Sequence, residues 1–122
     1  MKHYGKELIL DLHNCDISKF DKKGIQNFFD LLCKKIKMEQ VKSHWWTTEG
    51  LTKEELEIPH LRGTSAIQFI KTSNVTIHTL ELMGCCYINI FSCKNFNVHV
   101  AENFAKKYFK ATVANSVAVA RV

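Results

Sequence analysis

The chain of 122 residues is 46% hydrophobic and 24% charged. This length suits a single domain, residues 1–122, with a substantial core, and the composition excludes a low-complexity chain. No apolar run reaches the roughly 20 residues that a membrane span requires, and the first apolar run contains Asp11, which is unlike a signal peptide. The five cysteines include no CxxC pair, so we expect reduced thiols in a cytoplasmic protein with no membrane partner.

The net charge of +5 raises the question of nucleic-acid binding. The lysines are scattered over predicted helix surfaces, for instance Lys34, Lys35 and Lys106. A solvated helix face explains such a distribution better than a binding stripe does. We therefore expect no nucleic-acid partner. A binding measurement that detects no nucleic-acid complex even at low salt would confirm this expectation, because phosphate contacts are strongest at low salt.

The first third of the chain predicts one strand and one helix. Residues Glu7–Leu12 are rich in Leu and Ile and indicate a buried strand. A helix is predicted over Ile17–Met38, with Asp21 as the N-cap of its main body. Its apolar side chains recur at i, i+3, i+4, i+7 and i+11, which is the spacing of one buried stripe: Ile25, Phe28, Phe29, Leu32 and Ile36.

Residues 41–60 have the weakest pattern. Trp45 and Trp46 have strand character, and Thr47–Pro59 is predicted to be a loop with one helical turn at Lys53–Leu56. A loop of this length is often functional. The two tryptophans are candidate substrate-binding residues, as a stacking platform for a base or a cationic substrate. Strand aromatics that fill a core are an equally good interpretation, and the sequence leaves both open.

Three short apolar runs follow, each broken by a small or polar residue. They predict consecutive strands over Ser65–Lys71, Val75–Leu82 and Cys86–Cys93. Both faces of the third strand carry large apolar side chains, so we expect both faces of the sheet to be covered.

A second helix and a closing strand complete the chain, at Asn97–Lys110 and Thr112–Val122. The element order predicts an α+β fold: a two-layer sandwich in which a mostly antiparallel sheet carries two helices on one face. A second copy is the simplest cover for the other face, which gives an αββα homodimer. The apolar side of the second helix is expected to consist of Val100, Phe104, Tyr108 and Phe109.

The central strands also carry chemistry. Two hydroxyls, an imidazole and a thiol occur on adjacent predicted strands, at Ser65, Ser73, His78 and Cys93. A nucleophile, a base and a thiol brought together by neighbouring strands form a candidate active site.

The spacing of these residues resembles that of the prokaryotic S-adenosylmethionine decarboxylase family. Thr72-Ser73-Asn74 is followed by Ile77-His78-Thr79, and Cys93 comes twenty residues after Ser73. Ser65, within Gly63-x-Ser65, lies eight residues before Ser73. In the family, these positions belong to Ser-Glu-Ser-His, to Ile-His-Thr-Trp-Pro-Glu and to a strand that ends in a Thr-Cys pair. The resemblance covers about residues 1–110 and also implies dimerisation.

The resemblance implies a self-processing proenzyme. The Ser73 hydroxyl attacks the Thr72 carbonyl, and the chain becomes a fragment 1–72 and a fragment 73–122 headed by a pyruvoyl group. His78 matches the base of that reaction and Ser65 a hydroxyl that assists it. Cys93 matches the thiol that protonates the substrate carbon after carbon dioxide leaves. The pyruvoyl group is the electron sink for decarboxylation, and no metal is expected.

The departures from the family concern substrate recognition. Thr72 and Asn74 replace a glutamate and a histidine, and Leu80-Glu81-Leu82 replaces Trp-Pro-Glu. Glu81 is then one place out of register, on the opposite face of a regular strand, although it and Asp11 remain candidate substrate-binding residues. The family default is S-adenosylmethionine, in polyamine synthesis. The alternatives are L-ornithine or L-arginine, which need no adenosine pocket, or a dimeric binding module that does not process itself.

Overall fold

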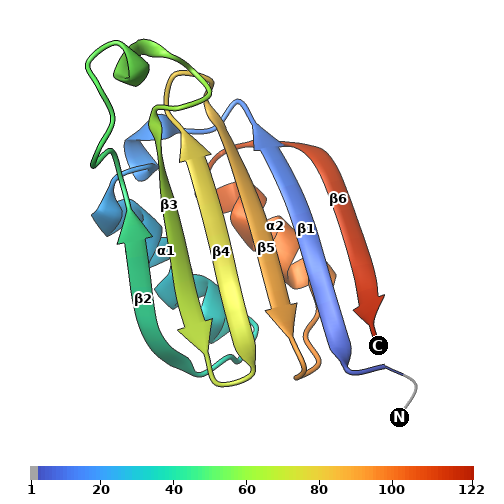
Figure 1. Ribbon diagram of the computed structural model, residues 1–122. Helices are drawn as coiled ribbons and strands as arrows, with labels where there is room; N and C mark the ends of the chain where they lie inside the picture. Colours follow the sequence, from blue (N-terminus) through green and yellow to red (C-terminus); the bar gives the residue numbers. More distant parts are fainter. Residues whose placement is uncertain (1–2) are drawn as a thin grey trace.

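The computed structural model describes residues 3–122, which form one antiparallel sheet with two helices packed on the same face (Figure 1). The strand order is β2-β3-β4-β5-β1-β6, and every neighbouring pair is antiparallel. The predicted α+β two-layer sandwich is therefore confirmed. The elements are β1 (Gly5–His13), α1 (Lys22–Lys35), β2 (Gln40–Trp46), β3 (Gly63–Ile70), β4 (Ser73–Leu80), β5 (Cys85–Ser92), α2 (Val98–Tyr108) and β6 (Thr112–Arg121), with short 3-10 turns at Ile17–Lys19 and Glu55–Glu57.

The first helix has the predicted apolar stripe but begins later than predicted. Asp16 and Asp21 each accept a hydrogen bond from a backbone N–H two or three residues further on, so the chain turns twice before α1 begins at Lys22. The prediction of a helix from Ile17 was wrong for this reason, whereas Asp21 is the N-cap as predicted. All five stripe residues are buried against the sheet: Ile25, Phe28, Phe29, Leu32 and Ile36.

The second helix buries Phe109 as predicted and packs Phe104 and Tyr108 against the core, whereas Val100 was wrongly predicted to belong to its apolar side. Val100 is 38% exposed, while Ala101, Ala105 and Phe109 are buried. The small alanine side chains let α2 pack closely on its neighbours, and the Phe104 ring stacks on the Phe28 ring of α1 with centroids 5.8 Å apart. The apolar periodicity of the sequence does not weight alanine strongly enough to show this.

The central strands lie where they were predicted, shifted toward the N-terminus by up to two residues. β4 ends at Leu80, so Glu81 lies in the turn that follows and not on a strand face as predicted. β3 and β4 form a hairpin whose two-residue turn is Lys71-Thr72, because Ile70 pairs directly with Ser73. No helix in residues 3–122 is long and apolar enough to cross a membrane.

The face of the sheet away from the helices is open in the single chain (Figure 1). Large apolar side chains stand on this open face, among them Phe69 (37% exposed), Val117 (42%) and Val119 (39%). The prediction that both faces are covered therefore holds for one face only within a single chain. The second copy that was predicted to cover the open face remains a proposal.

Candidate active site

The turn between β3 and β4 places the predicted cleavage site in strained backbone. Ser73 has a φ of +150°, a value that L-residues other than glycine rarely adopt. A residue held in such a region stores on the order of 1–3 kcal/mol, and such strain clusters at functional sites. Its neighbours hold it there, because Ser73 pairs with Ile70 on one side and with Ser92 on the other.

Two hydrogen bonds are donated to the groups that would react at the Thr72–Ser73 peptide, the carbonyl oxygen and the hydroxyl. The backbone N–H of Cys93 donates to the Thr72 carbonyl oxygen at 3.1 Å. The side-chain amide of Asn74 donates to Ser73 Oγ at 3.2 Å. A donor already aimed at a carbonyl oxygen stabilises the negative charge that develops there when a nucleophile attacks the carbonyl carbon. The arrangement can therefore support attack of Ser73 Oγ on its own preceding carbonyl.

The Cys93 thiol lies beside this turn and is exposed. It is near the hydroxyl of Tyr4, and hydrogen bonding to Cys93, followed by the charge of its thiolate, raises the pKa of Tyr4. A small pocket of about 130 Å³ lies here, lined by Tyr4, Gly5, Lys6, Cys93 and Lys94 among others. Ligand sites for drug-sized molecules usually enclose roughly 300–1,000 Å³, so this pocket alone is too small for S-adenosylmethionine.

The other half of the predicted site is a pair on β3 and β4. Ser65 and His78 are directly opposite each other in the strand register, and Ser65 Oγ lies 2.8 Å from His78 Nδ1. Burial lowers the pKa of His78 from its usual value of 6.5. The imidazole is therefore mainly neutral at neutral pH, which is the state of a general base.

His78 and Ser65 belong to a row of side chains that crosses the whole open face. Each member is the direct cross-strand partner of the next, from β2 to β6. We call this set the histidine row. It joins four further residues to the Ser65–His78 pair: the row is Trp46, Ser65, His78, Tyr87, Asp11 and Asn115.

The structure does not bring the two halves together within one chain. His78 is five residues from Ser73 on a strand without a bulge, and at a rise of about 3.3 Å per residue their Cα atoms are roughly 16 Å apart. The turn group, Thr72, Ser73, Asn74 and Cys93, lies at one end of β4, and the histidine row lies near the other. Direct contact between His78 and Ser73 in the same chain is excluded by this separation.

Two predicted substrate-binding residues lie apart from both groups. Trp45 faces the helices, where its ring packs 6.2 Å from the Phe29 ring, so the core interpretation of this residue describes its position. Glu81 in the turn after β4 forms an ion pair with Arg62 at 3.4 Å. Trp46, by contrast, lies on the open face and is 46% exposed.

Some residues of the two groups were missed by sequence reasoning. Asn74 was noted only as a departure from the family, and Tyr4 and Tyr87 were not singled out as site residues. The alternation of Tyr87 with its neighbours on β5 places it on the same face as Cys93, which was the available signal. Tyr4 had none, because its contact with Cys93 depends on how the chain enters β1.

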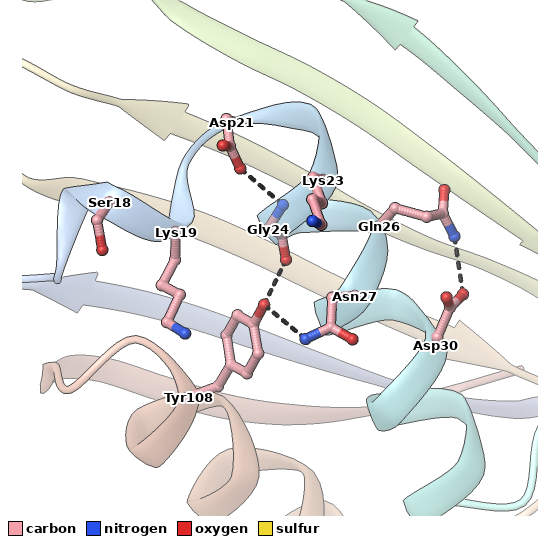
Figure 2. Close-up of a pocket in the computed structure, with 9 residues that line it drawn as sticks. All are labelled: Ser18, Lys19, Asp21, Lys23, Gly24, Gln26, Asn27, Asp30 and Tyr108. Atoms are coloured by element: carbon pink, nitrogen blue, oxygen red, sulfur yellow. Dashed lines mark hydrogen bonds between the residues drawn. The ribbon is translucent and has the colours of Figure 1, made fainter.

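A wide hollow of about 650 Å³ lies on the helix side of the molecule (Figure 2). Its polar groups are used to build the start of α1: Tyr108 donates to the Gly24 carbonyl at 2.5 Å and accepts from Asn27 at 3.3 Å, and Gln26 donates to Asp30 at 2.9 Å. None of the predicted site residues lines this hollow. It is a surface feature of the helix layer and does not contribute to the candidate active site.

The prosthetic group that the family resemblance implies would be made from the chain itself. The turn group fits its formation, since a hydroxyl, its preceding carbonyl and a donor to that carbonyl are all present at Thr72-Ser73. Within residues 3–122 no three His, Cys, Asp or Glu side chains are grouped so as to hold a metal ion.

The comparisons with known proteins agree with this fold and family. The fold resembles the crystal structure of the adenosylmethionine decarboxylase from Aquifex aeolicus, with a TM-score of 0.78, 16% identity, and coverage of 99% of this chain and 92% of that one. The chain is 25% identical over 125 residues to S-adenosylmethionine decarboxylase proenzyme 2 of Halalkalibacterium halodurans, covering 99% of this chain and 88% of that protein. The model of the S-adenosylmethionine decarboxylase family matches residues 6–122. The chain belongs to the S-adenosylmethionine decarboxylase family, which is a family of decarboxylases.

Proposed function

We propose that this chain is a self-processing, pyruvoyl-dependent decarboxylase of polyamine synthesis, with S-adenosylmethionine as the default substrate. The observation that carries the proposal is the Thr72–Ser73 junction. There, the φ of +150° at Ser73 and the Cys93 N–H on the Thr72 carbonyl prepare one peptide bond for reaction. Among residues 3–122, Ser73 is the one residue with a hydroxyl side chain whose φ is positive.

The proposed self-cleavage proceeds through ester formation, elimination and hydrolysis. Ser73 Oγ bonds to the Thr72 carbonyl carbon, the C–N bond breaks, and the hydroxyl proton passes to the Ser73 nitrogen, which leaves an ester. A base removes the Ser73 α-proton, the Cβ–O bond breaks, and Thr72 leaves as a carboxylate. Water then replaces the nitrogen, which departs as ammonia, and a ketone remains at the head of residues 73–122. This pyruvoyl group supplies the electron sink for decarboxylation of an amino-acid substrate.

His78 is the proposed base, and its partner Ser65 orients the imidazole from 2.8 Å. Because His78 does not reach Ser73 in its own chain, the proposal requires a second copy packed on the open face. A two-fold axis that runs across the strands reverses β4 in the partner. An axis that crosses β4 midway between Ser73 and His78 would bring the partner's His78 toward Ser73, so that the histidine row of each chain completes the turn group of the other.

The open face is suited to such a dimer. It carries apolar side chains that are partly exposed in the single chain, such as Phe69, Val117 and Val119. Exposed apolar groups gathered on one sheet face mark an interaction surface. Burial between two copies would also enlarge the small pocket beside Cys93, which is insufficient for the substrate on its own.

Mass spectrometry under denaturing conditions tests the cleavage. The purified chain should give fragments 1–72 and 73–122, the second with a ketone that reacts with hydrazines. A wild-type chain that stays intact after long incubation at neutral pH would overturn the proposal and favour the dimeric binding module.

Co-expression tests the shared site. Ser73→Ala and His78→Ala chains, each unable to process alone, should form a mixed dimer in which the His78→Ala chain is cut by the His78 of its partner. The two chains carry different tags so that the cut chain is identified. Cleavage of neither chain in the mixed dimer would show that His78 does not act across the interface.

L-Ornithine or L-arginine is the second candidate substrate, and two features favour it. Glu81, at the altered family motif, is engaged by Arg62 and is not free to bind a nucleoside sugar. Asp11 in the histidine row has an amide, Asn115, at 3.4 Å as its hydrogen-bonding partner, and forms no ion pair within residues 3–122. An open carboxylate suits a cationic side chain. Release of carbon dioxide from each of the three amino-acid substrates decides between them.

A further inference from the structure

The side chain of Thr72 belongs to a small cluster of hydrogen bonds at the hairpin turn. Ser92 Oγ lies 2.7 Å from Thr72 Oγ1 and accepts the backbone N–H of Lys94 at 3.0 Å. Thr72 Oγ1 and Ser92 Oγ each lie 3.6 Å from the sulfur of Met38. Ser92 is fully buried, and Met38 is 7% exposed.

The number of protons limits how the two hydroxyls are used. Each hydroxyl has one proton to donate. One hydroxyl donates to the other, and that other donates to the Met38 sulfur, so Thr72 and Ser92 are paired in either order while the Lys94 N–H donates to Ser92 Oγ. Successive hydrogen bonds that point the same way polarise and strengthen one another in a buried environment.

Thr72 is consequently held at two points by three consecutive residues, from the last residue of β5 onward. Ser92 and, through it, Lys94 hold the hydroxyl, while the Cys93 N–H holds the carbonyl oxygen at 3.1 Å. Two anchors on one residue prevent rotation of the peptide plane that contains the carbonyl. A carbonyl that cannot rotate presents a constant face to the neighbouring Ser73 hydroxyl.

We propose that Thr72 and Ser92 are positioning residues for self-cleavage: their paired hydroxyls hold the Thr72 carbonyl for attack by Ser73. The inference rests on the proposed function and extends it, since neither hydroxyl touches the reacting atoms. It also gives a role to the Thr72 departure noted in the sequence, because the glutamate of the resembled family at this position has no hydroxyl to pair with that of Ser92.

The test is the rate of cleavage of freshly refolded chains. Thr72→Val and Ser92→Ala remove one hydroxyl each and should slow cleavage by about tenfold or more, because a small misplacement of reacting groups has effects up to about a hundredfold. Thr72→Ser and Ser92→Thr keep the hydroxyls and should cleave at nearly the wild-type rate. Thr79→Val is the matched control, since Thr79 is a buried threonine on β4 whose hydroxyl donates to the Thr64 carbonyl at 3.4 Å.

Hydroxylamine identifies the step that is slowed. It cuts the ester, so a chain that forms ester but cannot eliminate gives hydroxylamine-sensitive material. Thr72→Val and Ser92→Ala should accumulate none, because positioning acts on ester formation. Accumulated ester in either variant would overturn the inference.

The outcomes separate this inference from the proposed function. If the wild-type chain does not cleave, the proposed function fails and the positioning role fails with it. If the wild-type chain cleaves and Thr72→Val and Ser92→Ala cleave equally fast, only the positioning role fails. An equal slowing in Thr79→Val, with matched melting temperatures, would show that lost packing explains the result and would also overturn it.

Discussion

The two ends of β4 prepare chemistry in different ways. At the turn group the backbone supplies the reactive geometry: Ser73 has a φ of +150°, and a main-chain N–H from Cys93 addresses the Thr72 carbonyl. At the histidine row the side chains supply it, with Ser65 and His78 paired across two strands. Backbone groups can polarise a carbonyl, but they cannot remove a proton at neutral pH. The comparison shows why the proposed reaction needs both ends and why one chain, with roughly 16 Å between them, does not complete the site.

The largest expected effect is the removal of the nucleophile from the turn group. Ser73→Ala should leave one intact chain on denaturing mass spectrometry, because a methyl group cannot attack the Thr72 carbonyl. The fold should persist, with an unchanged circular dichroism spectrum. Ser18→Ala, which alters an exposed serine near the start of α1, is the control and should cleave normally. Cleavage of the Ser73→Ala chain at the same bond would rule out Ser73 as the nucleophile.

Separation of the two copies should be nearly as damaging. Phe69→Asp places a charge on the open face at a side chain that is 37% exposed, so folding should be preserved while the dimer is lost. Sedimentation should give a monomer, and cleavage should fall by a factor of a hundred or so, as for loss of a general base.

Leu31→Asp is the matched substitution, because Leu31 is 40% exposed on α1, away from the open face. It should leave both assembly and cleavage unchanged. A monomeric Phe69→Asp chain that cleaves at the wild-type rate would contradict the division of the site between two copies.

Loss of the imidazole should slow the second step only. His78→Ala should reduce pyruvoyl formation by about 10²–10⁴-fold, the usual contribution of a general base, and should accumulate an ester that hydroxylamine cuts. In the wild-type chain, the rate should be constant at neutral pH and should fall in acid, because the protonated imidazole cannot act as a base.

The position of that fall reports the environment of His78. Burial favours the neutral imidazole and lowers its pKa from 6.5, so the midpoint of the pH–rate profile should lie below 6.5. A midpoint above that value would indicate that a negative charge, and not burial, controls this histidine in the assembled site.

The smallest effect concerns substrate recognition in the histidine row. Asp11→Asn should raise the KM for a cationic amino acid by about tenfold, which corresponds to 1.4 kcal/mol, without changing the rate of self-cleavage. Steady-state release of carbon dioxide measures the first quantity, and mass spectrometry the second. Asn115→Ala is the control for a change in the orientation of the Asp11 carboxylate. It removes the one side-chain hydrogen-bonding partner found for this carboxylate among the described residues. An unaltered KM in Asp11→Asn would remove this carboxylate from the substrate site.

Much of the fold could be predicted from the chain alone because it depends on short-range periodicity. The apolar residues of α1 repeat on one helical face, and the Asp21 carboxylate caps the N-terminus of the helix. The three central strands are separated by turns that the sequence marks clearly. Resemblance in the spacing of Ser65, Ser73 and His78 also identified the family, since these residues lie on strands whose order follows the chain.

Tertiary structure decided what depends on register and on contacts between distant segments. The φ of Ser73, the donation from Cys93 to Thr72, and the pairing of Thr72 with Ser92 arise because β5 lies beside the β3–β4 turn. The same register aligns Trp46 and Asp11 with His78 in one row and leaves Trp45 on the helix side. Sequence distance carries no information about such alignments, because a one-residue shift of a strand exchanges its faces. The residue types of the site were therefore evident in the sequence, whereas its division into two halves follows only from the geometry of the sheet.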